Sequence, residues 1–158
     1  MVRKINPNID IFRQIYGGRK PKCKGIVNRK RKKNSLNKLL DSLWSKAVKK
    51  LAKEKCEYCE STNNLNSHHI IGRRNFAVRW NINNGVCLCG LHHTFSSKFS
   101  AHQTPTLFSD FIQKKRGKEW YRQLIMSSTI PKLTISDKEE FRSTLETIVY
   151  GKPKKLPF

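Results

Sequence analysis

The chain has 158 residues, enough for one modest core with peripheral helices and too few for two elaborate domains. It carries 33 Lys and Arg against 11 Asp and Glu, and the net charge of +22 favours a polyanionic partner, nucleic acid above all. The sequence contains no apolar run of transmembrane or signal-peptide length. We therefore expect no membrane partner and a cytoplasmic protein.

Residues 1–34 are predicted to form a basic N-terminal arm. Residues 1–55 hold 18 basic and 3 acidic side chains, a net charge of +15. The densest basic run is expected to bind DNA and comprises Arg29, Lys30, Arg31, Lys32 and Lys33. Each phosphate that such an arm neutralises should steepen the log–log salt dependence of affinity by roughly 0.9 on duplex DNA. The alternative is a lysine-rich surface that serves solubility alone, and the clustering of the charge argues against it.

Residues 35–55 are predicted to form an amphipathic helix capped by Asn34 or Ser35. Apolar side chains recur there at the spacing of one helical face, with lysines on the opposite face. These apolar residues are Leu36, Leu39, Leu40, Leu43, Trp44, Ala47, Val48 and Leu51.

Residues 56–104 are predicted to form the functional core of an α+β protein. We expect two short strands, at Ser67–Ile71 and Val86–Cys89, and then a helix over Leu91–Phe99. The aromatic side chains expected to pack beneath these elements are Trp80, Phe95 and Phe99.

Residues 105–158 are predicted to form a C-terminal helical region. Thr106 is expected to cap its first helix, and the apolar pattern resumes after Gly117. Ser136 and Glu139 have the spacing of a capping box, which predicts the start of the last helix.

Two pairs of potential metal ligands have the same spacing, namely Cys56 with Cys59 and Cys89 with His92. Each pair can reach one tetrahedral ion, and the four together make a closed Cys3His set, which is typical of a structural zinc site. Cys87 could compete for a place, although on a strand it is more simply a core residue. Lone, buried thiols are the alternative, which two pairs of matching spacing disfavour.

The order of further residues around these ligands resembles the HNH nuclease family. Ser67-His68-His69-Ile70 follows the first cysteine pair, Asn84 lies five residues before Cys89, and His93 follows the last zinc ligand. This pattern is similar to the zinc-stapled ββα-metal core of that family, over about a quarter of the chain. The stretch from Gly72 to Phe108 also resembles phage-encoded members, including the recombination-associated NinG-like group.

The resemblance implies a metal-dependent DNA endonuclease that hydrolyses phosphodiester bonds, nicking or cutting duplex or branched DNA. In this interpretation His69 is the general base, and His68 and His93 hold one catalytic divalent cation, Mg, Mn, Ni or Zn. Asn84 would pin the loop that carries the base and orient His69. Imidazoles at both ligand positions favour Zn, Ni or Mn over Mg.

The segment between the strands carries Arg73, Arg74 and Arg79, which are predicted to contact phosphates beside the cut; a solvated loop is the alternative. His102 is expected to be a loop residue, with a phosphate contact as the other option. Two rival functions remain, a non-catalytic zinc-finger module that binds nucleic acid and an RNA-cleaving nuclease. The sequence predicts no oligomeric state.

Overall fold

A computed structural model describes residues 24–129 and 133–151, with side chains from Ser35 onward. The chain divides into two units, residues 1–36 and residues 37–158. Helix α2 (Lys24–Leu51) includes the described part of the first unit and continues into the second. The helix therefore begins well before the predicted cap at Asn34 or Ser35. The N-terminal portion of the predicted arm lies outside the described residues.

The basic run of residues 29–33 lies on the helical backbone of α2, and its side chains lie outside the described residues. A helix there needs no apolar stripe, because Lys and Arg are good helix formers. The sequence analysis placed this run in an arm that precedes the helix. That prediction was wrong, because the backbone of residues 29–33 is part of α2.

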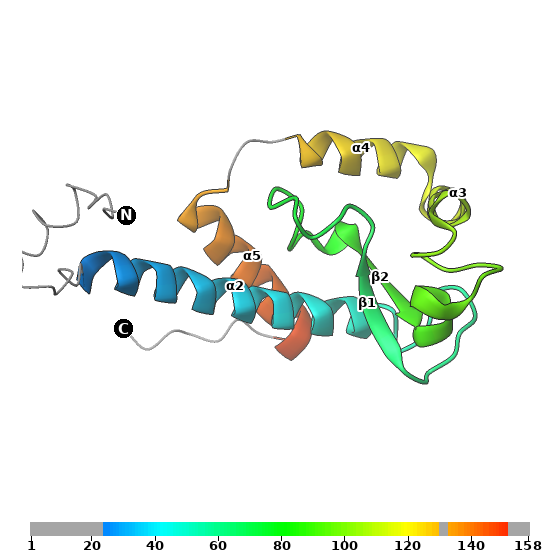
Figure 1. The fold of residues 1–158 in the computed structure, drawn as a ribbon, viewed down its shortest axis with the longest axis horizontal. Helices are drawn as coiled ribbons and strands as arrows, with labels where there is room; N and C mark the ends of the chain where they lie inside the picture. Colours follow the sequence, from blue (N-terminus) through cyan, green and yellow to red (C-terminus); the bar gives the residue numbers. More distant parts are fainter. Residues whose placement is uncertain (1–23, 130–132, 152–158) are drawn as a thin grey trace, which may run out of the picture. The chain divides into compact units, whose positions relative to one another are not determined.

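The second unit combines helices with a two-stranded antiparallel sheet, which confirms the α+β class (Figure 1). Beyond α2 its elements are β1 (Leu65–His69), a 3₁₀ turn (Ile82–Asn84), β2 (Gly85–Cys89), the helical turn η2 (Leu91–Phe95), α3 (Pro105–Arg116), α4 (Lys118–Ser128) and α5 (Ile135–Tyr150). None of the helices in the described part of the chain is long and apolar enough to cross a membrane.

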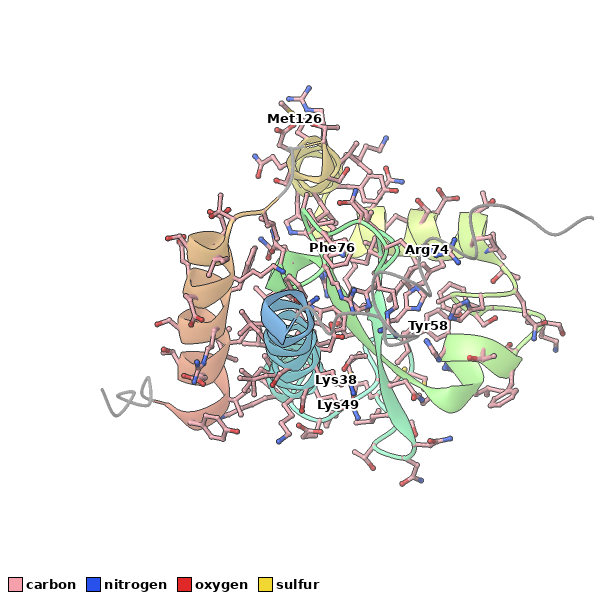
Figure 2. The ribbon with its side chains drawn as sticks, turned by 60° about the vertical axis from the view of Figure 1, so that its left-hand side comes forward. Lys38, Lys49, Tyr58, Arg74, Phe76 and Met126 are labelled. Atoms are coloured by element: carbon pink, nitrogen blue, oxygen red, sulfur yellow. The ribbon has the colours of Figure 1, made fainter. Side chains whose placement is uncertain are left out.

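The C-terminal half of α2 supplies one wall of the core. The middle of its predicted apolar stripe is buried, namely Leu40, Leu43, Trp44, Ala47 and Val48. Leu39 and Leu51, which were predicted on the same face, are 40% and 58% exposed. The Trp44 indole N–H donates to the carbonyl of Asn81 at 3.0 Å, so the helix is tied to the segment before β2. Lysines such as Lys38 and Lys49 project from α2 (Figure 2).

The two strands pair in a register that brings Leu65 opposite Cys89 and His69 opposite Gly85. Strand β2 is fully buried, while β1 is half-buried along its length. Gly85 passes so close to α2 that a Cβ at this position would collide with the Val48 side chain. The strand can therefore approach the helix only because this residue lacks a side chain.

Several predicted boundaries differ from the structure. The helix expected over Leu91–Phe99 is one turn that ends at Phe95, whose ring is 71% exposed and not part of the core. Phe99 and Trp80 are buried as predicted. The last helix is capped by Thr134 with Asp137, not by the predicted pair two residues later. Both pairs have capping-box spacing, and the structure uses the earlier one.

Candidate functional site

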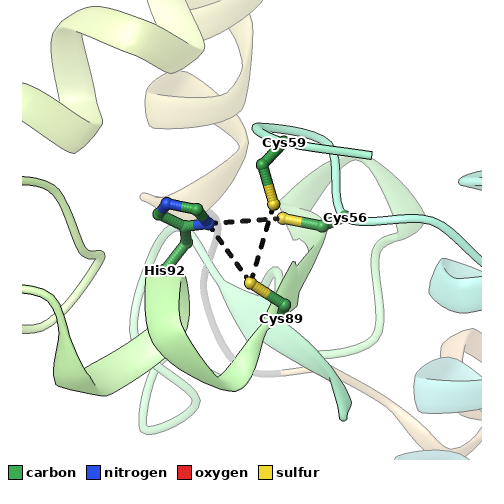
Figure 3. A group of neighbouring side chains, drawn as sticks. All are labelled: Cys56, Cys59, Cys89 and His92. Atoms are coloured by element: carbon green, nitrogen blue, oxygen red, sulfur yellow. Dashed lines mark hydrogen bonds between the residues drawn. The ribbon is translucent and has the colours of Figure 1, made fainter. Parts of the chain in front are cut away.

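Four side chains from three separate segments converge on one point (Figure 3). Cys56 and Cys59 lie in the turn that follows α2, Cys89 ends β2, and His92 lies in η2. The Cys89 Sγ is 3.2 Å from His92 Nδ1, and the Cys56 Sγ is 3.9 Å from the same nitrogen. The Cys59 Sγ is 3.8 Å from the Cys89 Sγ. The structure therefore brings together the four predicted ligands.

The spacing of these atoms fits one tetrahedral ion. Bonds of about 2.3 Å from zinc to sulfur place two sulfurs about 3.8 Å apart in a tetrahedron. All four candidate ligand atoms lie within 4.8 Å of one another. The cluster is thus suited to a metal ion, and a soft thiolate-rich set favours zinc over magnesium or calcium.

The protonation of the thiols also suits a cation. Burial and the neighbouring sulfurs raise the pKa of Cys59 to about 11. Burial acts in the same sense on Cys56, but backbone N–H groups directed at its sulfur outweigh burial and lower its pKa. A cluster of three thiols cannot lose all its protons without a compensating positive charge, which a divalent ion would supply.

The turn that carries the cysteines is fixed to the rest of the unit through Glu57. Its carboxylate accepts hydrogen bonds from both the Arg116 guanidinium, at 2.9 and 3.0 Å, and the Cys87 backbone N–H, at 3.1 Å. Cys87 itself is fully buried and lies outside the metal cluster. Burial raises the pKa of its thiol to about 11, so Cys87 is a protonated core residue, as expected.

A second cluster consists of three histidines, His68 on β1, His93 in η2 and His102 in the segment before α3. Candidate nitrogen atoms of the three rings lie within 4.8 Å of one another. The ring centroids of His93 and His102 are 4.8 Å apart, and that of His68 lies 5.2 Å and 5.0 Å from them. The structure therefore joins His102 to the two predicted ligands of the catalytic ion, although the sequence predicted a loop residue there.

His68 and His93 are disposed to remain neutral, because the pKa of each is lowered. Burial, aided by repulsion from His93 and His102, lowers the pKa of His68 to about 3. Burial also lowers the pKa of His93, with a further contribution from His102. Neutral imidazoles are the form that binds metal ions.

The predicted base, His69, contacts a different set of groups from its neighbour His68. Its ring stacks on Trp44 with centroids 3.7 Å apart, and its Nε2 lies 3.0 Å from the carbonyl oxygen of Arg79. Because a carbonyl only accepts, Nε2 carries the hydrogen of the neutral ring and Nδ1 is left as a proton acceptor. Burial lowers the pKa of His69, which keeps this acceptor available at neutral pH.

An acidic residue that the sequence analysis missed holds the segment behind His69. Asp41 on α2 accepts from the Arg79 guanidinium at 2.9 and 2.6 Å and from the Trp80 indole N–H at 2.8 Å. The Arg79 side chain is only 12% exposed, so it stabilises the fold through Asp41. The prediction that Arg79 is a free phosphate ligand was therefore wrong. Arg73, by contrast, is 68% exposed and lies 3.7 Å from Asp41.

Asn84 is fully buried and fixes the segment that follows β1. Its Oδ1 accepts from the Ile71 N–H at 2.6 Å, and its Nδ2 donates to the carbonyls of Ile71 and Val78 at 2.9 and 3.1 Å. It does not contact His69 directly through these bonds. Its side chain instead holds both ends of the 71–78 segment, and Arg79, which contacts His69, follows directly.

We compared the chain with protein-family models, with curated proteins and with solved structures, and none of the three comparisons gave a match.

Proposed function

We propose that this protein is a metal-dependent endonuclease of the HNH type, with its ββα-metal core in residues 56–104, and that it hydrolyses phosphodiester bonds in DNA. The observation that carries the proposal is that two candidate metal sites with different ligands lie next to each other. A thiolate-rich cluster suited to a structural zinc ion lies one residue from an imidazole cluster, since His92 belongs to the first and His93 to the second. On β1, His68 of the imidazole cluster is followed directly by His69, the candidate base.

The donor sets of the two clusters suit them to different roles. Four protein ligands close the first cluster, as in structural zinc sites, where the ion contributes directly to folding. The histidine cluster lacks thiolates and leaves coordination positions for a substrate. A divalent ion bound there would stabilise negative charge on the scissile phosphate and on the leaving oxygen.

The residues of the chain would perform the remaining steps. His69 Nδ1 accepts a proton from a water molecule whose oxygen forms a bond to phosphorus, and the bond from phosphorus to the 3′ oxygen breaks. The 3′ oxygen then takes a proton from solvent, so that the products carry a 5′ phosphate and a 3′ hydroxyl. The Arg79 carbonyl and the Trp44 ring hold His69 in orientation.

DNA is the proposed substrate because of the charge of the chain. The net charge is +22, and the exposed Arg73 and Arg74 lie in the segment that follows His69, where they can contact backbone phosphates. Phosphate chemistry alone does not distinguish DNA from RNA, so the test includes both.

The test is cleavage by the purified full-length protein. Supercoiled, linear and branched DNA and a structured RNA are incubated with the protein and with Mg²⁺, Mn²⁺, Ni²⁺, Co²⁺ or Zn²⁺ in turn. His69→Ala should lower the rate of DNA cleavage by roughly 10²–10⁴-fold, the usual contribution of a positioned base, while DNA affinity stays near that of the wild type.

The control variant is Met126→Ala, which removes a side chain exposed on α4 and should cut as fast as the wild type (Figure 2). Equal rates for His69→Ala and wild type would contradict the assignment of the base. Cleavage of RNA alone would change the substrate, and binding of DNA without any cleavage in any metal would favour the zinc-finger binding module.

A further inference from the structure

We propose that His102 is a third ligand of the metal ion held by His68 and His93, and that this all-imidazole site selects transition metal ions over Mg²⁺. The binding of the ion follows from the cluster itself, and only its role in cleavage rests on the proposed function. The three rings come from β1, η2 and the segment before α3, so that the fold, and not local sequence, assembles the site.

The position of the His102 backbone is fixed by two hydrogen bonds to η2. The N–H of Ala101 donates to the His92 carbonyl at 2.9 Å, and the N–H of His102 donates to the His93 carbonyl at 3.2 Å. The segment of His102 therefore runs against η2, whose residues 92 and 93 belong to the two clusters.

The turn around His102 is further held by hydrogen bonds through Ser100, which is fully buried. The Ser100 N–H donates to the Thr104 hydroxyl at 2.9 Å, which donates to the Ser100 carbonyl at 2.9 Å. The Gln103 side-chain amide donates to the Thr94 carbonyl at 2.7 Å. These bonds hold the turn closed on η2, so that the backbone of His102 is positioned before any ion binds.

The ring of His93 is oriented by a neighbour in the manner of metal-bound histidines. The Thr94 hydroxyl lies 3.0 Å from His93 Nδ1, which leaves Nε2 as the nitrogen for a ligand. A hydrogen bond at the second ring nitrogen is a common feature of histidines that bind metals. The Phe108 ring meets His68 edge to face at 5.2 Å and restricts that ring as well.

The donor set determines which ion the site should prefer. Imidazole nitrogens bind Zn²⁺, Ni²⁺ and Co²⁺ well, whereas Mg²⁺ prefers oxygen ligands in an octahedron. Bonds of about 2.0–2.1 Å require nitrogens about 3.3 Å apart in a tetrahedron. His102 is exposed, so its ring has the freedom to rotate to that spacing.

The test uses Co²⁺ as a visible probe. Full-length protein that retains its tightly bound zinc after dialysis against a mild chelator is titrated with CoCl₂. Binding should produce the visible bands of cobalt with nitrogen and oxygen ligands, without the near-ultraviolet band that thiolate ligands cause. Excess Mg²⁺ should not displace the cobalt.

His102→Ala should weaken the affinity for Co²⁺ by at least about 10-fold. His102→Asp, which supplies a carboxylate oxygen as a ligand in place of the imidazole, should recover part of the affinity that His102→Ala loses. The matched control is His69→Ala, which removes the neighbouring imidazole outside the cluster and should bind Co²⁺ like the wild type. Far-ultraviolet circular dichroism verifies that each variant is folded.

The proposal is overturned if His102→Ala binds Co²⁺ as tightly as His69→Ala, or if the zinc-loaded wild type binds no Co²⁺. Loss of Co²⁺ binding in His102→Ala supports it even if the wild type cuts no nucleic acid, a result that would contradict only the proposed function. Conversely, if Mg²⁺ supports DNA cleavage and His102→Ala does not change its rate, His102 is not a ligand of the catalytic ion. That result would not contradict the nuclease function.

Discussion

Asp41 shows how one carboxylate can position a group that it does not touch. It binds Arg79 and Trp80 from a helix that lies 38 and 39 positions earlier in the chain. The carbonyl of Arg79 in turn lies 3.0 Å from His69. The orientation of the candidate base therefore depends on an ion pair between α2 and the segment before β2.

The same ion pair should contribute to stability in a pH-dependent way. Burial raises the pKa of Asp41, but hydrogen bonds from Arg79 and Trp80 and the nearby guanidinium charges outweigh it, so the pKa lies below its ordinary value near 3.8. A depressed carboxyl pKa stabilises the fold above the pKa of the unfolded chain, and this contribution disappears as the pH falls through the folded pKa.

Asp41→Asn should therefore lower the free energy of unfolding at pH 7 by about 1–2 kcal/mol, at the lower end for hydrogen bonds to charged groups because Asp41 is partly exposed. Urea unfolding measures this loss. Asp110→Asn, which changes an exposed carboxylate on α3, is the control and should have little effect. An NMR titration midpoint of Asp41 at or above its ordinary value would contradict the prediction.

The residues of the site were predictable to different degrees, for physical reasons. The clustering of Cys56, Cys59, Cys89 and His92 was predictable, because ligands of a structural metal ion commonly come in pairs whose spacing is local. The pairing of Asp41 with Arg79 and the position of His102 depend on contacts between distant segments, for which the sequence carries no spacing rule. Arg79 was therefore taken for a phosphate ligand, and His102 for a loop residue.

At the scale of elements, β2 depends on its first residue. Gly85 lies where the strand passes over α2, and any side chain there would meet Val48 and come within 3.1 Å of Trp44. The close approach lets His69, opposite Gly85 in the sheet, stack on the same Trp44 ring. Packing of β2 and the position of the candidate base are thus linked through one glycine.

Gly85→Ala should destabilise the protein by about 1–3 kcal/mol, because the added methyl group overpacks the contact between β2 and α2. Thermal and urea unfolding measure this effect. Gly72→Ala is the matched control, since a Cβ at Gly72 meets nothing within 4 Å. An equal effect of the two substitutions would show that the contact with α2 does not limit position 85.

The apolar face of α2 was predictable because its periodicity is strong, whereas its start was not. The helix extends to Lys24 through a basic segment without an apolar stripe. The predicted strands lay within two residues of the observed ones. The helix after β2 proved to be one turn, because hydrogen bonds from residues 101 and 102 to η2 replace its continuation.

At the scale of the whole molecule, stability should depend on the metal held by the thiolate-rich cluster. The cluster joins the turn after α2 to β2 and η2, beside a small hydrophobic core. Structural zinc ions contribute about 10–16 kcal/mol to folding in small domains, as much as the whole stability of many of them.

Metal analysis of the dialysed protein should find about one tightly held zinc per chain, and a strong chelator should abolish the cooperative unfolding transition. Cys56→Ser should have the same effect as the chelator. Cys87→Ala, a change at a buried cysteine of the same strand as Cys89, should retain the zinc. A well-folded protein that contains no zinc would disprove the structural role of the ion.

The dipeptide formed by Asn84 and Gly85 has a consequence for the chemical ageing of the protein. In a flexible chain, the nitrogen of a glycine after asparagine readily attacks the side-chain amide, and deamidation to aspartate or isoaspartate follows. Here the Gly85 N–H donates to the Ile82 carbonyl, and the Asn84 amide is held by Ile71 and Val78. Both reacting groups are restrained, so the rate of damage should follow the rate of local opening. Protein from which the metal has been removed should therefore deamidate at Asn84 during storage, while metal-loaded protein should not. Peptide mass spectrometry measures the extent of deamidation in each sample, and equal extents in the two would contradict this prediction.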